Sequence, residues 1–119
     1  METRHFRDLQ VWQRSMSLVR EVYAVTESFP RGEQFGLVSQ IRRAAVSVPS
    51  NIAEGRGRNT PRSFALFLSQ ARGSLYELQT QVELASDLGF LARDRAQSVM
   101  SEAAEIASMI QGLATALRE

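Results

Sequence analysis

The spacing of the apolar residues is the feature of this sequence that most constrains its fold. In four separate segments, apolar residues recur every three or four positions, which places them along one face of an α-helix. No segment alternates between apolar and polar residues at every second position, as a half-buried β-strand would. The sequence therefore predicts an all-α protein.

The predicted helices are separated by short connections and span about residues 8–28, 33–54, 61–88 and 94–117. Thr60 followed by Pro61 is a typical helix start, and Gly55, Gly57 and Gly89 are expected to end the helices that precede them. An apolar spacing of about 3.5 residues is typical of helices that pack at shallow angles, and short connections make neighbouring helices antiparallel. We therefore expect one domain, residues 1–119, folded as an up-down-up-down antiparallel four-helix bundle.

The first predicted helix carries two apolar rows. The row expected to face the core is Leu9, Trp12, Met16, Val19, Tyr23 and Thr26. The other row is Val11, Leu18, Val22, Val25 and Phe29. A helix that is apolar on more than one face must bury more than one face, so the sequence predicts self-association. Val11, Leu18 and Val22 are therefore candidates for subunit contact, with a widened core of the single chain as the alternative.

The stretch SQIRRAAVSVPSNIAEGRGR, residues 39–58, is predicted to pack on several sides of one helix. Its core stripe is flanked by a row of mostly small residues, which would let a second helix approach closely. Pro49 lies inside the stretch, and we expect one kinked helix there rather than two helices. The candidates for helix packing or subunit contact in this stretch are Ala44, Ser47, Pro49 and Asn51.

The charges of the chain are unevenly distributed, although its net charge is only +1. Residues 31–72 hold seven arginines against two glutamates, a local charge of +5, whereas residues 73–119 hold three arginines against seven acids, a local charge of −4. Because all basic residues are arginines, the basic segment predicts contact with phosphate groups. Salt bridges, either within the chain or between subunits, are the alternative use of these charges.

Two groups of arginines in the basic segment are candidates for binding nucleic acid. Arg56, Arg58 and Arg62 lie around the turn before the third helix, whose amino-terminus favours anions. Arg42 and Arg43 form a separate level farther back on the second helix, and Arg72 of the third helix is a candidate neighbour of that level.

Several classes of function are disfavoured by composition. The chain has no cysteine and one histidine, His5, which argues against thiolate chemistry, a histidine-based triad and a histidine-rich metal site. We therefore expect no enzyme activity, no metal and no cofactor. No apolar run approaches the roughly 18 residues of a membrane span, and the start METRHFRDLQ has no signal-peptide pattern, so we expect a cytoplasmic protein without membrane contact.

Three long segments resemble a known family. GLVSQIRRAAVSVPSNIAEGRGR, residues 36–58, resembles the signature of the bacterial four-helix-bundle proteins that are encoded in intervening sequences of large-subunit ribosomal RNA genes. FRDLQVWQRS, residues 6–15, and FALFLSQARGSLYELQTQVELASDLGFL, residues 64–91, resemble it as well. The resemblance implies a four-helix bundle assembled as a homopentamer. A related branch, the accessory variability proteins of diversity-generating retroelements, is similar in fold and associates with a reverse transcriptase and nucleic acid.

Two functions stay open on the sequence. The first is a non-catalytic, oligomeric protein that binds RNA or another nucleic acid through its arginine clusters. The second is a scaffold or accessory subunit that binds a protein, such as a reverse transcriptase, and makes no nucleic-acid contact of its own.

Overall fold

The fold is built from four long helices. The computed structural model describes residues 5–118, so residues 1–4 and 119 of the predicted domain lie outside the described part. The helices are α1 (Gln10–Thr26), α2 (Leu37–Gly57), α3 (Pro61–Asp87) and α4 (Arg93–Leu117), with short 3₁₀ helices η1 (Phe6–Asp8) and η2 (Arg31–Glu33). Residues 5–118 contain no strand, which confirms the all-α prediction.

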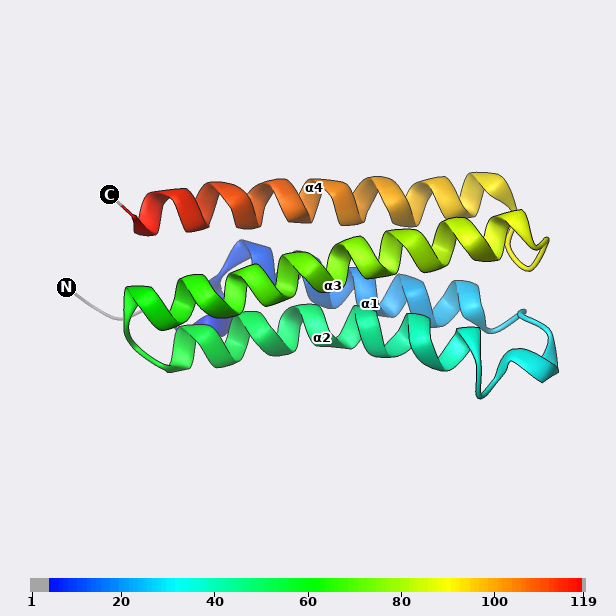
Figure 1. Cartoon of the computed structure of the whole chain (residues 1–119), viewed down its shortest axis with the longest axis horizontal. Helices are drawn as coiled ribbons and strands as arrows, with labels where there is room; N and C mark the ends of the chain where they lie inside the picture. The colour runs from blue at the N-terminus through cyan, green and yellow to red at the C-terminus, as the bar shows by residue number, and fades with distance from the viewer. Residues whose placement is uncertain (1–4, 119) are drawn as a thin grey trace.

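The four helices pack as the sides of an elongated bundle. Each helix packs closely on the two helices beside it, and within the described part no Cα atoms of the diagonal pairs α1–α3 and α2–α4 come within 8 Å of each other. Successive helices run in opposite directions along the bundle, as Figure 1 shows, which confirms the predicted four-helix bundle. The bundle measures 49 × 21 × 19 Å, so its two ends are separate surfaces.

The row of α1 that faces the core is not the expected one. Val11, Leu18 and Val22 are 5%, 1% and 0% exposed inside the chain's own core, so they serve helix packing, the alternative to subunit contact that the sequence left open. Most of the row expected in the core lies at the edge of the bundle instead, where Trp12 is partly buried and Tyr23 is 42% exposed, although Thr26 at the end of that row is buried. Both rows have the same helical period, so the period alone could not decide between them.

An ion pair on the opposite side of α1 agrees with this rotation of the helix. Arg14 donates from Nε and Nη2 to both carboxylate oxygens of Glu102 on α4, each at 2.9 Å, and from Nη2 to Glu105 at 3.0 Å. These hydrogen bonds, the one to Glu102 most of all, raise the pKa of the Arg14 guanidinium above its ordinary value. Arginine is already fully charged at its ordinary pKa, so the raised pKa does not change the charge of Arg14. The hydrogen bonds to Glu102 hold this face of α1 against α4.

The small-residue row of α2 lies against α3, as the sequence predicted for a second helix. Ala44 is buried there, and the hydroxyl of Ser47 lies 2.7 Å from that of Ser74 on α3. Asn51 donates to the Ser47 carbonyl at 2.8 Å and to its hydroxyl at 3.0 Å. These residues therefore serve packing between two helices of the same chain.

Pro49 lies inside an uninterrupted α2, which confirms one helix in place of two. Its ring is buried, and the Ser50 hydroxyl next to it donates to the carbonyl of Val46 at 2.9 Å. Because Pro49 has no N–H, the carbonyl of Ala45 lacks its helical donor, and the Ser50 hydroxyl does not replace that donor since it bonds the carbonyl of Val46.

The glycines at the end of α2 have a different role from the one expected. The helix continues through Gly55 and Gly57, and the residue in the left-handed conformation is Asn59, with φ 67°. A Cβ atom on Gly55 would lie 2.6 Å from the Cβ of Phe67 on α3, so this glycine allows the two helices to approach. Gly89, with φ 82°, does end α3 as predicted.

Replacement of Gly55 by alanine is expected to lower the free energy of unfolding by about 1–3 kcal/mol, because the added methyl group overpacks the contact with Phe67. Gly57 is the matched control in the same helix turn, since nothing lies within 4 Å of its added Cβ. Gly57→Ala should be neutral or stabilise by about 0.5–1 kcal/mol. Urea unfolding followed by circular dichroism measures both, and equal effects at the two positions would contradict the close approach.

Candidate nucleic-acid interface at the end of the bundle

Three helix ends meet at the end of the bundle where the chain terminates (Figure 1). The connection from α2 to α3 is short because Asn59 turns the chain and Thr60 caps α3, its hydroxyl accepting from the Ser63 N–H at 3.1 Å. Pro61 then begins α3, where its missing N–H has no cost. The last turn of α4 packs beside this connection, because Leu117 and Arg56 line one pocket.

The arginines at this end come from three helices, and we call them the terminal arginine cluster. Its members are Arg56, Arg58, Arg62 and Arg118. Beside Arg56 lies a pocket of about 320 Å³, which is also lined by Thr60, Phe64 and Leu117. The structure thus keeps the three arginines predicted around the turn at one end and adds a fourth.

The charge of the cluster is only partly neutralised within the chain. Arg58 donates to Glu54 at 2.9 Å, and its guanidinium lies 5.0 Å from the centre of the Phe67 ring. Within residues 5–118, neither Arg56 nor Arg62 forms an ion pair. The amino-terminus of α3 adds a partial positive charge to the same surface.

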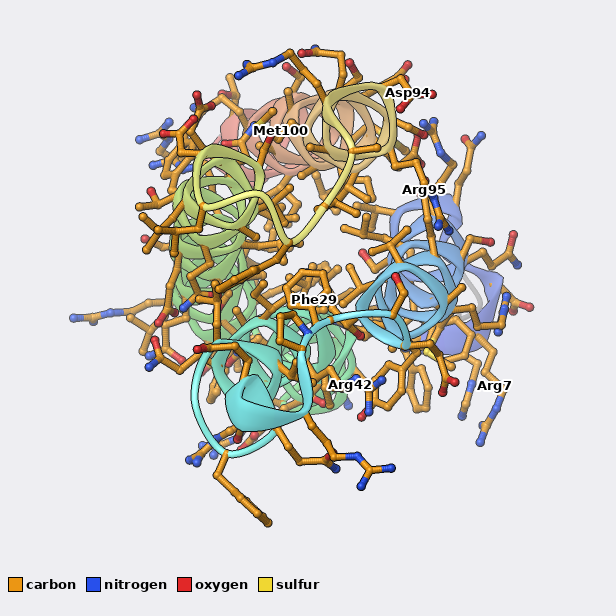
Figure 2. All side chains as sticks on the ribbon, turned by 90° about the vertical axis from the view of Figure 1, so that its right-hand side faces the viewer. Arg7, Phe29, Arg42, Asp94, Arg95 and Met100 are labelled. Atoms are coloured by element: carbon orange, nitrogen blue, oxygen red, sulfur yellow. The ribbon has the colours of Figure 1, made fainter. Side chains whose placement is uncertain are left out.

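Arg42 and Arg43 do not join this cluster. Arg42 turns toward α1, where its Nε donates to the Thr26 hydroxyl at 2.9 Å and its Nη2 to the Tyr23 carbonyl at 3.4 Å. Its guanidinium also covers the Tyr23 ring, 4.3 Å from the ring centre, and Figure 2 shows it between α2 and α1. Arg42 therefore holds the carboxyl-terminal turn of α1 against α2, whereas Arg43 is exposed.

Arg72 lies on another side of the bundle and does not neighbour Arg42 and Arg43. It lines a pocket between α3 and α4 together with Ser69, Gln111 and Arg118. Through Arg118, Arg72 belongs to the surface next to the terminal arginine cluster.

Sequence reasoning missed Arg118. Nothing in the local pattern singles it out, because the fourth helix has only a generic amphipathic period. The signal lay in the topology: in an up-down-up-down bundle the end of the fourth helix returns to the level of the connection between the second and third. Arg118 follows the last apolar residue of that helix and so lies at the same end of the bundle as Arg56 and Arg62.

The described part of the chain holds no group of three or more His, Cys, Asp or Glu residues that could bind a metal ion. None of its helices is both long enough and apolar enough to cross a membrane.

A family model for 23S rRNA-intervening sequence proteins matches residues 7–112 of the chain. The chain belongs to this family. The matched range covers all of α1, α2 and α3 and most of α4, so it includes the terminal arginine cluster except Arg118.

Among solved structures, the intervening sequence protein is similar to a protein of unknown function from the S23 ribosomal protein family of Bacteroides thetaiotaomicron. The TM-score is 0.80 at 22% sequence identity, and the match covers 87% of this chain and 97% of the other. At that identity the similarity shows a shared fold. No curated protein sequence matches the chain.

Arg42→Gln is expected to lower the free energy of unfolding by about 1–2 kcal/mol, because it removes two hydrogen bonds and a cation from the end of α1. Arg43→Gln is the matched control, one residue along and exposed, and should change stability by less than about 0.5 kcal/mol. Urea unfolding compares the two variants. A loss at Arg43 as large as that at Arg42 would show that Arg42 has no special packing role.

Proposed function

We propose that this protein is a non-catalytic, oligomeric four-helix-bundle protein that binds RNA in the cytoplasm through the terminal arginine cluster. The observation that carries the proposal is the convergence of Arg56, Arg62 and Arg118 from three helices on one end of the bundle. Such an arrangement has a cost in mutual repulsion that contact with a polyanion removes. Arginine suits this role because its planar guanidinium group matches the geometry of a phosphate.

The expected mode of binding is contact with the phosphate backbone. The cluster lies on an exposed helix end, and arginine-to-phosphate contacts position a nucleic acid without reading its sequence. Each cluster alone would bind weakly, because it offers few contacts. The homopentamer implied by the family resemblance would present five copies of the cluster, and simultaneous contacts raise the overall affinity through effective concentration.

A scaffold or accessory subunit is the second candidate function. A shallow apolar groove between α1 and α2 favours it, since the groove exposes side chains that would fit a protein surface. In this case the terminal arginines would serve contacts with a protein partner. The accessory variability proteins, which associate with a reverse transcriptase, suggest one class of partner.

The test of RNA binding removes three arginines from the terminal cluster. Arg56, Arg62 and Arg118 are changed together to alanine, and binding of a labelled single-stranded RNA is followed by fluorescence anisotropy across a salt series. We expect weaker binding and a slope of log affinity against log salt that is shallower by about 2, which is about 0.7 for each lost phosphate contact.

The matched control changes Arg31, Arg93 and Arg95, at the opposite end of the bundle, to alanine. It removes the same charge and should keep most of the affinity and the salt slope. Equal losses in both variants would assign binding to overall charge, and a wild-type protein that binds no RNA at low salt would favour the scaffold. Cleavage of the labelled RNA by the purified protein would refute the non-catalytic assignment.

A further inference from the structure

The outer surface between α1 and α2 is apolar over about half the length of the bundle. Trp12, Met16 and Val19 of α1 and Val46 and Ala53 of α2 line a groove of about 330 Å³, which we call the α1/α2 groove. A neighbouring pocket of about 570 Å³ continues it past Val46. The side chains around this second pocket include Tyr23, 42% exposed, and Phe35, 95% exposed.

Phe35 and the groove beside it are apolar and exposed, and this exposure does not contribute to the packing of the single chain. An exposed phenylalanine at the rim of a contiguous apolar groove is typical of a surface that a partner covers. The rotation of α1 creates this surface, because it turns Trp12, Met16 and Tyr23 outward when the valine row enters the core.

A second exposed apolar surface lies on the outer side of α3. Tyr76 and Leu84, in the carboxyl-terminal half of this helix, are 55% and 46% exposed, and Leu88, directly after the helix, is 55% exposed. This half, residues 76–88, extends about 18 Å at roughly 1.5 Å per residue. The α1 side of the groove, from Trp12 to Tyr23, extends about 16 Å by the same measure. The two surfaces therefore match in length.

Charge distinguishes the two surfaces. Arg42 and Arg43 line the neighbouring pocket that continues the groove past Val46. Residues 76–88 contain Glu77, Glu83 and Asp87 and no basic residue. The pocket that continues the groove is thus lined by two cations, whereas residues 76–88 of the outer surface of α3 carry only anions.

We infer that the α1/α2 groove of one chain receives the outer surface of α3, residues 76–88, from a second copy of the same chain. This inference rests on the self-association in the proposed function and names the surfaces that make it. The complementary charges select this pairing, because each arginine-bordered groove meets an acidic surface. A groove-to-groove contact would instead bring Arg42 and Arg43 close to their own copies, and an α3-to-α3 contact would oppose acids with acids.

The inferred contact is head-to-tail, since the two surfaces belong to different parts of the chain. Such contacts form closed rings when the two surfaces are turned relative to each other, and open filaments when they are not. The groove lies between α1 and α2, and α3 is the next helix around the bundle, as the end-on view in Figure 2 shows. The two surfaces therefore do not lie on opposite sides of the bundle. Each added chain is then rotated relative to the previous one, and repeated rotation in one direction closes a ring. A cyclic pentamer belongs to this class.

The test uses two variants that each destroy one surface. Val46→Glu places a carboxylate in the groove, where it would face the acids of the incoming α3. Leu84→Arg places a guanidinium on α3, where it would face the arginines of the groove. Both positions are exposed in the single chain, at 38% and 46%. We expect each substitution to weaken association by at least about 30-fold, because the contact would bury an unpaired charge next to like charges.

Light scattering during size exclusion gives the mass of each species. The wild-type protein should elute as a multiple of the 13.3 kDa chain, and each variant alone as a single chain. An equal mixture of the two variants should associate again, because one intact groove and one intact α3 surface remain. Leu66→Arg is the matched control: it makes the same substitution on the same helix at a 58% exposed position outside residues 76–88, and it should assemble like the wild type.

The alternative outcomes separate this contact from the assembly itself. A wild-type protein that stays a single chain at high concentration would refute both the proposed oligomer and the contact. A wild-type oligomer that Leu84→Arg leaves intact would refute the contact alone, as would a mixture of folded variants that stays monomeric. Circular dichroism verifies that each variant is helical, and Arg43→Glu, at an exposed position, serves as a second groove variant if Val46→Glu does not fold.

Discussion

The close approach of α2 to α3 is the constraint on which the rest of the structure depends. Gly55 leaves room for Phe67, and the paired hydroxyls of Ser47 and Ser74 let the two backbones approach where larger side chains would hold them apart. The small residues of α2 therefore lie on the flank that packs against α3. Its other flank, with Val46 and Pro49, faces the bulky side chains of α1, and the α1/α2 groove lies between them.

The terminal arginine cluster and the α1/α2 groove are separate surfaces with compatible roles. The cluster lies at one end of the bundle and the groove along its side, so contact with RNA and contact between chains need not compete. In a ring of chains related by one rotation axis, every copy of an exposed surface is presented in the same way. The ring would therefore gather the weak phosphate contacts of Arg56, Arg62 and Arg118 into one repeated surface, which links the inferred assembly to the proposed binding.

Much of the fold and part of the site could be predicted from residues alone. The four helical periods, the Thr60–Pro61 start and the short connections were sufficient for the bundle, because each depends on local backbone preferences. Arg56, Arg58 and Arg62 were found because they are neighbours in sequence. The contacts of Arg42 could not be predicted in this way, because its hydrogen bonds reach α1 across sixteen residues in one case, to Thr26, and nineteen in the other, to Tyr23. A sequence motif shows that an arginine is present but not which helix it contacts.

The sequence by itself determined the helical class, the number and order of the helices and the basic character of the segment around α2. Only the tertiary structure decided which apolar row of α1 enters the core, why residue 55 is a glycine, and that the last turn of α4 lies beside Arg56. The physical reason is that a period is a property of one helix, whereas its rotation about its own axis is set by its neighbours. For α1 these neighbours are Glu102 and Glu105, which bind Arg14, and the α2 flank that holds Arg42.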